Sequence, residues 1–257
     1  SRLALGRREQ AARDLERVST RHAALSGMEI AAELLARDDT PWDGPGDPWF
    51  TPVQIRTNPH AVSIHITDEQ SKISLAHLVR PSGEINEPLL QVFKRCFPGT
   101  TLDPEIWRDG IERWRRGPAP QRLTRDAAMK ILARSGTWSR TDHRGIVPAP
   151  DASLLTVSGN GRININTAAD TVLEAIGGES FRRAVTAARS EHPLPTVFDP
   201  SIRHTLPPEA ASYLDVRTSF FRITISASGS FVTAHTEAIL WRQSGRFTVT
   251  AYREWWS

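Results

Sequence analysis

Alternating apolar residues occur near both ends of the chain, and about 150 residues separate the two groups. Val62, Ile64 and Ile66 alternate with polar residues, and residues 221–227 do the same. This period of two is typical of half-buried strands. An isolated hairpin is only marginally stable, so we expect the two groups to meet in one sheet. The residues between them then form an insertion in one of its connections.

Further strands are predicted beside these two. The segment VQIRT at residues 53–57 is expected to pair with the strand around Ile64. After residues 221–227, short turns containing Ser and Gly separate FVTAHTEAILW at 231–241 from RFTVTAY at 246–252. The C-terminal residues are therefore predicted to form an antiparallel meander.

Residues 9 to about 37 are predicted to form one long helix. The residues of its amphipathic stripe recur at steps of three and four; they are Ala11, Leu15, Val18, His22, Leu25, Ala32 and Leu35. At 1.5 Å per residue the helix is about 43 Å long, which exceeds most helices of globular proteins. Part of it is therefore expected to project or to continue an earlier segment. The Pro- and Gly-rich stretch DDTPWDGPGDPW at 38–49 ends it.

Residues 68 to about 215 have a different character, because helix-like segments alternate there with Pro-rich joints. The predicted architecture is α+β: a long N-terminal helix on an antiparallel sheet, with an α-helical domain inserted in a sheet connection. The expected parts are the helix at 1–38, the first part of the sheet domain at 39–67, the inserted domain at 68–217 and the closing strands at 218–257.

The segment SGNGRININTAADTVLEAIGG, residues 158–178, contains an unusual alternation. Asn164 lies between Ile163 and Ile165, and Asn166 follows Ile165, although asparagine is a poor strand former. Gly159 and Gly161 precede them and permit a tight turn. A brief extended segment after a turn is therefore predicted.

A helix is predicted to begin directly after this segment. The side chain of Asn166 or Thr167 is expected to be its N-cap, which contributes about 1 kcal/mol. The helix is predicted to end at Gly177-Gly178, and residues 181–189 form a second helix. The asparagines thus belong to a predicted helix-hairpin-helix, and we assign a structural role to Gly159, Gly161, Asn164, Asn166 and Thr167.

The composition is that of a globular protein. Of the 257 residues, 39% are hydrophobic and 24% are charged, and the net charge of +3 is too small by itself to indicate nucleic acid. No run approaches the roughly 18 apolar residues of a membrane helix, and the first residues lack the apolar core of a signal peptide. Cys96 is the only cysteine, so an internal disulfide and a cysteine-based zinc site are excluded.

Taken in order, several segments resemble the K class of minor pseudopilins in bacterial type II secretion. GRININTA at 161–168 is similar to a family motif that is followed by a helical pair ending on Ala-Arg, as at residues 188–189. The family also has a similar segment earlier in its sequence, and DEQSKISLAHL at 68–78 is similar to that segment. The strand at 219–225 and the YRE at 252–254 match the end of the family pattern. The resemblance covers nearly the whole chain.

The resemblance implies a pilin-like α+β fold with an inserted helix-hairpin-helix (SAM-like) domain. It implies a non-catalytic protein that caps the tip of the pseudopilus in a heterotrimer with the I-class and J-class minor pseudopilins. The N-terminal helix and a sheet face are expected to contact these partners, and the secreted substrate and the outer-membrane secretin are further expected partners. The soluble domain is expected in the periplasm, held at the inner membrane by an N-terminal anchor absent from these residues.

The family commonly has an acidic stretch, and some members bind calcium. At the corresponding place this chain has ERWRRGPAPQR at 112–122, so the acidic pattern is lost there. Hard cations take several oxygen ligands, and the glycine loop offers Asp39, Asp43 and Asp47 as calcium candidates, with Asp38 beside them. The alternative is an acidic, solvated loop, because the spacing does not match an EF-hand.

Two other classes of function remain as alternatives. Helix-hairpin-helix proteins bind nucleic-acid phosphates at a Gly-hydrophobic-Gly turn; here the turn is GGES at 177–180, and Glu179 places a negative charge where a phosphate would lie. Arg182, Arg183 and Arg189 partly offset that charge.

An enzyme is the other alternative. No phosphate-loop, zincin or nucleophile-elbow motif occurs, and the eight histidines are scattered singly. Cys96 is interpreted as a packed residue at a helix end. Trp255 and Trp256 either pack on the edge of the sheet or face a partner.

Overall fold

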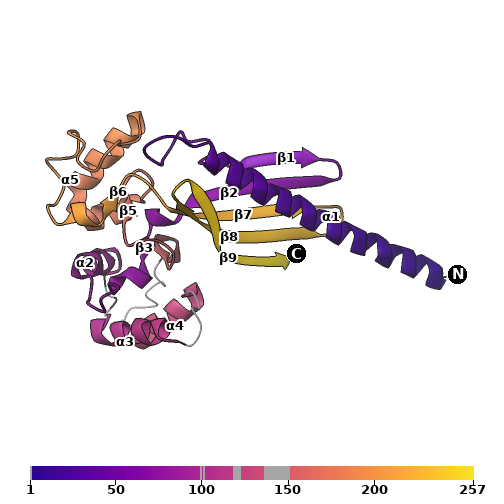
Figure 1. The fold of residues 1–257 in the computed structure, drawn as a ribbon, viewed down its shortest axis with the longest axis horizontal. Helices are drawn as coiled ribbons and strands as arrows, with labels where there is room; N and C mark the ends of the chain where they lie inside the picture. The colour runs from indigo at the N-terminus through magenta and orange to yellow at the C-terminus, as the bar shows by residue number, and fades with distance from the viewer. Residues whose placement is uncertain (1, 99, 101, 118–122, 136–150) are drawn as a thin grey trace, which may run out of the picture. The chain divides into compact units, whose positions relative to one another are not determined.

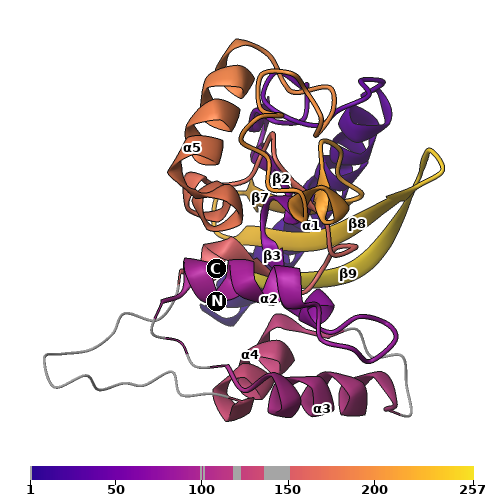
Figure 2. The same cartoon turned by 90° about the vertical axis from the view of Figure 1, so that its left-hand side faces the viewer.

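The computed structural model describes residues 2–98, 100, 102–117, 123–135 and 151–257. The chain divides into two compact units, each with its own hydrophobic core. The first unit comprises residues 1–40, 46–68 and 220–257, and the second comprises residues 41–45 and 69–219. Figures 1 and 2 show their elements in two views.

The first unit contains a five-stranded antiparallel sheet (Figure 1). β2 pairs with β7, and Ile64 lies opposite Ile225, so the two groups of strands meet in one sheet as predicted. The pairing of VQIRT with its neighbour is also confirmed. In spatial order the strands are β1 (Val53–Thr57), β2 (His60–Asp68), β7 (Phe220–Ser228), β8 (Thr233–Gln243) and β9 (Arg246–Trp256).

Helix α1 (Arg2–Ala36) lies on one face of this sheet and contacts β2, β7 and β8 (Figure 1). The long helix is confirmed, and it begins earlier than predicted. The predicted packing stripe is wrong, because of its seven members only Leu35 is buried. The residues that α1 buries against the sheet are mainly small: Thr20, Ala24, Gly27, Ala31 and Leu35.

Gly27 shows why the packing face is made of small residues. A Cβ atom there would lie 3.1 Å from Cγ2 of Ile225 and 3.2 Å from Cγ1 of Val62. These distances are shorter than ordinary van der Waals contact, so the helix backbone lies close to the sheet. Among the described residues, no helix has a stretch that is both apolar and long enough to cross a bilayer.

The second unit is mostly helical. Its helices are α2 (Glu87–Cys96), α3 (Pro104–Arg115), α4 (Arg125–Ser135) and α5 (Asp170–Glu191). α3 packs against α4, and α2 packs against α5 (Figure 2). Short 3-10 helices are η1 (Glu69–Ser71), η2 (Leu75–Leu78), η3 (Ala152–Leu154) and η4 (Ala210–Ser212).

Two pairs of very short strands join distant segments of this unit. β3 (Ile73–Ser74) pairs in parallel with β4 (Leu155–Thr156), and β5 (Ile163–Asn164) pairs in parallel with β6 (Leu214–Asp215). β3 and β5 are the two segments whose sequences resemble each other, and each contributes a fully buried isoleucine.

Helix α5 corrects one prediction and supports another. Gly178 has φ +77° and ψ −176°, which is not helical, so the break predicted at the glycines is present. The predicted N-cap is wrong, because the N-cap residue is Ala169 and no side chain caps the helix. The side chain of Asn166 has other partners.

Candidate functional site

An exposed apolar surface runs along α1 and the edge strand β9, and we call it the α1–β9 face. Arg21 of α1 forms an ion pair with Glu254 of β9, with 3.0 Å between Nε and Oε1. This pair holds the outer side of the helix beside the strand. The face consists of Val18, Leu25, Val249, Tyr252 and Trp256.

The positions of these residues relative to the ion pair show that they share one side. Val18 and Leu25 precede and follow Arg21 by three and four residues, which places them on the same side of α1. Tyr252 and Trp256 lie two residues to either side of Glu254 and share its face of the strand.

The α1–β9 face has the composition of a contact surface. Val18 is 57% exposed and Trp256 is 40% exposed, although both side chains are large and apolar. Contiguous exposed apolar side chains mark interaction sites, and tyrosine and tryptophan often contribute most of the binding energy at such sites.

Trp255 lies on the opposite face of β9 and is 38% exposed. Its ring stacks on His235 with 5.3 Å between centroids and 10° between planes. The guanidinium of Arg253 lies 4.8 Å from the centroid of the tryptophan ring. Trp255 thus makes contacts within its own sheet, but it is about as exposed as Trp256, which belongs to the α1–β9 face.

The glycines before the asparagine motif form a tight turn. Gly159 and Gly161 have φ values of +140° and +83°, which favour glycine. At Gly161 space is also restricted, because a Cβ atom would lie 3.1 Å from the ring of His77.

Asn166 is buried and bonds to two backbone segments. Its Nδ2 donates to the carbonyl oxygens of Leu194 at 3.0 Å and Val216 at 3.4 Å. Its Oδ1 accepts the N–H of Leu194 at 2.8 Å. One side chain thus joins residues 166, 194 and 216, which are distant in sequence.

Asn164 is also buried and extends this network. Its Nδ2 donates to the carbonyl oxygen of Asp43 at 3.0 Å, and its Oδ1 accepts the N–H of Asn166 at 3.0 Å. Thr167 donates from Oγ1 to the carbonyl oxygen of Asn164 at 3.4 Å. The motif therefore orders backbone by long-range hydrogen bonds and not by capping a helix.

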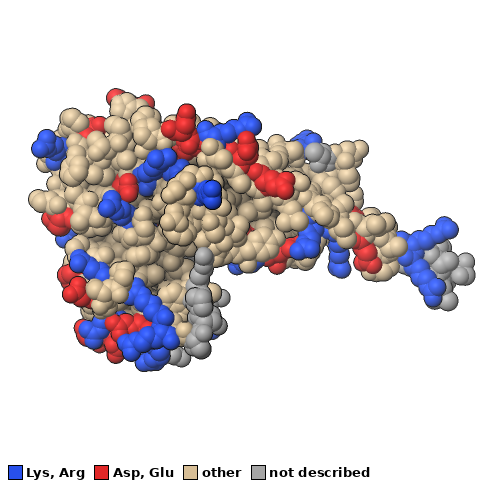
Figure 3. Space-filling model, viewed as in Figure 1, with Lys and Arg blue, Asp and Glu red and all other residues tan. Residues whose placement is uncertain are grey.

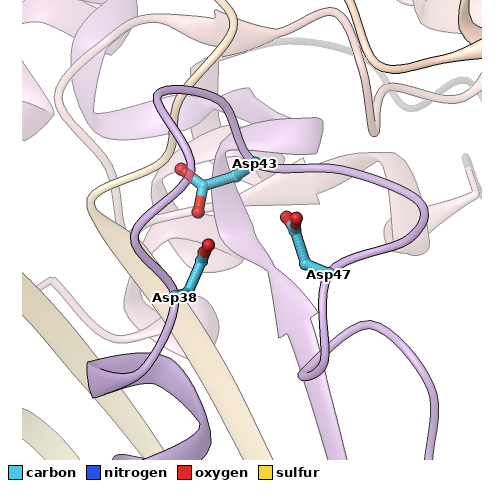
Figure 4. Close-up of side chains that lie close together, drawn as sticks. All are labelled: Asp38, Asp43 and Asp47. Carbon is cyan, nitrogen blue, oxygen red and sulfur yellow. The ribbon is translucent and has the colours of Figure 1, made fainter.

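The acidic loop after α1 brings three carboxylates together. One oxygen each of Asp38, Asp43 and Asp47 lies within 4.8 Å of the others (Figure 4). Of the calcium candidates, Asp43 and Asp47 are thus adjacent, whereas Asp39 is exposed and Asp38 takes its place. Among the described residues, this is the one group of three or more His, Cys, Asp or Glu side chains that could hold a metal ion.

The three carboxylates are buried, so the alternative of a solvated loop is wrong for them. Asp38 accepts the Nε1–H of Trp49 at 3.1 Å and lies 3.8 Å from a guanidinium nitrogen of Arg242. Asp43 accepts the N–H of Thr218 at 2.7 Å. Oxygen ligands suit a hard cation, but these donors also compensate buried carboxylates directly.

Arg115 lies where the family pattern would be acidic, and it binds backbone oxygens. Its guanidinium donates to the carbonyl oxygens of Arg80 and Val79, both at 2.7 Å, and of Ala76 at 3.3 Å. These bonds connect the end of α3 to η2.

The neighbouring His77 is affected by this arrangement. Burial lowers the pKa of His77 to about 4, and the positive charge of Arg115 is a second cause.

The arginines of α5 are paired with carboxylates. Arg182 donates to Glu179 at 2.7 Å and to Asp170 at 3.0 Å, and Arg189 donates to Asp170 at 3.0 Å. Hydrogen bonds from Arg182 lower the pKa of Glu179 to about 2. A phosphate at this turn would have to displace these carboxylates, so the arrangement does not favour the nucleic-acid alternative.

Cys96 ends α2 as a partly buried residue. Burial raises the pKa of its thiol to about 12, and Sγ lies 3.7 Å from the carbonyl oxygen of Thr171. The predicted packed cysteine at a helix end is confirmed.

Comparison with solved structures finds a chain of similar fold. A chain of the GspK–GspI–GspJ complex from the type 2 secretion system of enterotoxigenic Escherichia coli matches with a TM-score of 0.59 and 14% sequence identity. The match covers 95% of this chain and 99% of that chain. This chain has a GspK-like fold. The predicted α+β class, with the long helix on an antiparallel sheet and further helices, is thereby confirmed. No protein-family model and no curated protein matches the sequence.

Proposed function

We propose that this chain is a K-class minor pseudopilin that acts at the tip of the type II secretion pseudopilus. The observation that carries the proposal is the likeness in fold to a chain of a GspK–GspI–GspJ complex over nearly the full length of both chains. The order of the sequence motifs, from residues 68–78 through 161–168 to 252–254, supports the same class. The role is one of assembly and requires no catalytic group.

We infer that the chain assembles with I-class and J-class minor pseudopilins through the α1–β9 face. α1 buries small residues against its own sheet and leaves Leu15, Val18 and Leu25 exposed. These side chains are available to pack against the N-terminal helices of the partners. Tyr252 and Trp256 extend the contact onto the sheet edge, where aromatic side chains contribute strongly to binding.

We further propose that residues 68–217 form one inserted domain that caps the tip. The compact unit formed mainly by residues 69–219 supports this division. Ile106 and Phe198 are exposed apolar side chains of that unit, and they are candidate contacts for the secreted substrate or the secretin. An anchor before α1 would hold the chain at the inner membrane, with both units in the periplasm.

The test is assembly from purified components. This chain is mixed with the soluble domains of the I-class and J-class minor pseudopilins of the same organism, and native mass spectrometry is used to detect a complex with one copy of each. We expect that complex to form. Its absence would contradict the proposal.

Charged substitutions test the surface that is used. The double variant Val18→Glu/Leu25→Glu should weaken the complex at least about tenfold, because two charges would be buried in the contact. The matched control is Ile106→Glu/Phe198→Glu, which adds the same charges to the second unit and should leave the affinity unchanged. Equal effects of the two double variants would exclude the α1–β9 face as the contact.

A further inference from the structure

A hollow lies between the N-terminal half of α1 and the turn that joins β7 to β8. Its lining consists of Gln10, Arg13 and Arg17 from the helix and Phe231 and Val232 from the turn. All five residues belong to the first unit. The hollow therefore combines cationic and apolar side chains within one unit.

The turn is fixed to α1 through its backbone. The N–H of Phe231 donates to Oε1 of Glu16 at 2.8 Å, and Gly229 approaches the same carboxylate so closely that a Cβ atom would overlap it. The side chain of Phe231 is nevertheless 69% exposed. The fold thus presents an exposed aromatic ring from an anchored backbone.

The two arginines of the hollow have no carboxylate partner among the described residues. In the part of the chain that the structure describes, neither Arg13 nor Arg17 makes a hydrogen bond or an ion pair. They are four residues apart on α1, where like charges destabilise a helix. Of the acidic residues between them, Asp14 accepts a hydrogen bond from Gln10 at 3.0 Å, and Glu16 accepts the turn N–H. An external anion would relieve the repulsion between the arginines.

The surrounding surface is also cationic. Arg7 and Arg8 are exposed on the preceding turn of α1, and the exposed Glu9 offsets only part of their charge. Figure 3 shows basic side chains gathered on this projecting end of the helix. Arginines beside an exposed aromatic ring are typical of surfaces that dock on anionic lipid.

We propose that this end of the first unit docks on an anionic phospholipid surface. Arg13 and Arg17 bind the lipid phosphates in the hollow, and Phe231 enters the boundary between headgroups and acyl chains. The five residues of the hollow are not members of the α1–β9 face, although Arg17 lies one turn from Arg21 on the same side of α1; a lipid ligand also goes beyond the proposed assembly function. Either one can fail without the other.

Vesicle flotation of the full chain tests the inference. We expect binding to phosphatidylcholine vesicles that contain about one third phosphatidylglycerol, and at least about tenfold weaker binding to pure phosphatidylcholine. Arg13→Glu/Arg17→Glu should lower binding to the anionic vesicles by about tenfold or more. Phe231→Ser should weaken binding to the anionic vesicles in both low and high salt, because the contribution of the phenylalanine ring is apolar.

Matched controls carry the same changes elsewhere. Arg203→Glu/Arg246→Glu reverses two other exposed arginines, and Phe198→Ser removes an exposed phenylalanine of the second unit. Both controls should bind like the wild type, and circular dichroism verifies that every variant is folded. Equal binding to both kinds of vesicle, or equal losses in variants and controls, would overturn the inference.

Thermal unfolding in millimolar inorganic phosphate tests whether the ligand is a free anion. Stabilisation by phosphate that depends on Arg13 and Arg17, without vesicle binding, would identify a free anion as the ligand and overturn the lipid assignment.

Discussion

At the scale of single residues, Asn166 shows how a side chain can replace a backbone partner. A carboxamide carries the same donor and acceptor groups as a peptide bond. Asn166 exchanges two hydrogen bonds with the backbone of Leu194, as paired residues of antiparallel strands do. Leu194 is fully buried, so its N–H and carbonyl group would otherwise lack water as a partner.

The variant Asn166→Leu removes these partners at nearly constant volume. It leaves the N–H and carbonyl group of Leu194 unpaired, whereas the carbonyl oxygen of Val216 still accepts the N–H of Asp43 at 2.8 Å, and we expect the free energy of unfolding to fall by about 2–5 kcal/mol. Urea unfolding measures the loss. The control Asn86→Leu removes one bond, from Nδ2 to the carbonyl oxygen of His77 at 3.1 Å, and should cost about 1 kcal/mol. Similar losses in both variants would contradict this assignment.

His77 should make the stability depend on pH. Burial lowers its pKa from 6.5 to about 4, so between these values the unfolded chain binds a proton that the folded protein does not. The free energy of unfolding should therefore decrease as the pH falls from 6.5 toward 4, by on the order of 3 kcal/mol. Urea unfolding at several pH values should show a smaller decrease for His77→Gln. Parallel curves for the two proteins would contradict the prediction.

At the scale of elements, two sides of α1 differ in their residues and in their contacts. Its small residues permit close approach to the sheet, and its larger apolar residues remain exposed. Gly27→Leu should lower the free energy of unfolding by about 1–3 kcal/mol, although leucine has a higher helix propensity than glycine. Ala12→Leu, at an exposed position of the same helix, is the control and should not destabilise. Thermal unfolding distinguishes the two, and an equal effect at both positions would exclude close packing as the cause.

At the scale of the whole molecule, the two hydrophobic cores formed by the described residues share no buried residue. We therefore expect Gly27→Leu to lower the transition temperature of the first unit and Asn166→Leu that of the second. Differential scanning calorimetry measures both transitions. A single transition that both variants shift by the same amount would show that the two cores unfold together.

The sequence predicts those features that depend on local periodicity. The strands near Ile64 and Ile225 alternate with period two, and a lone hairpin is unstable, so their pairing could be inferred across the insertion. The existence of α1 could also be inferred from a local period, because apolar residues recur there at steps of three and four. Its buried face could not, because Ala24, Gly27 and Ala31 carry little hydrophobic signal and their burial depends on the approach of the sheet.

Features that depend on distant partners could not be predicted. Asparagine before a helix is a common N-cap, and only the fold reveals that Asn166 bonds to residues 194 and 216 instead. The α1–β9 face rests on an ion pair between Arg21 and Glu254, which are 233 residues apart. In the acidic loop, composition identifies the carboxylates, but the path of the backbone selects Asp38 over Asp39.

Cys96 has a practical consequence for experiments on this molecule. Its thiol has a pKa of about 12, so very little thiolate is present near neutral pH. Maleimide reagents should therefore modify a cysteine introduced at an exposed position such as Ala12 and leave the native one unmodified. Fluorescent or spin probes attached in this way can report distances to the partners proposed for this chain while every other residue stays native.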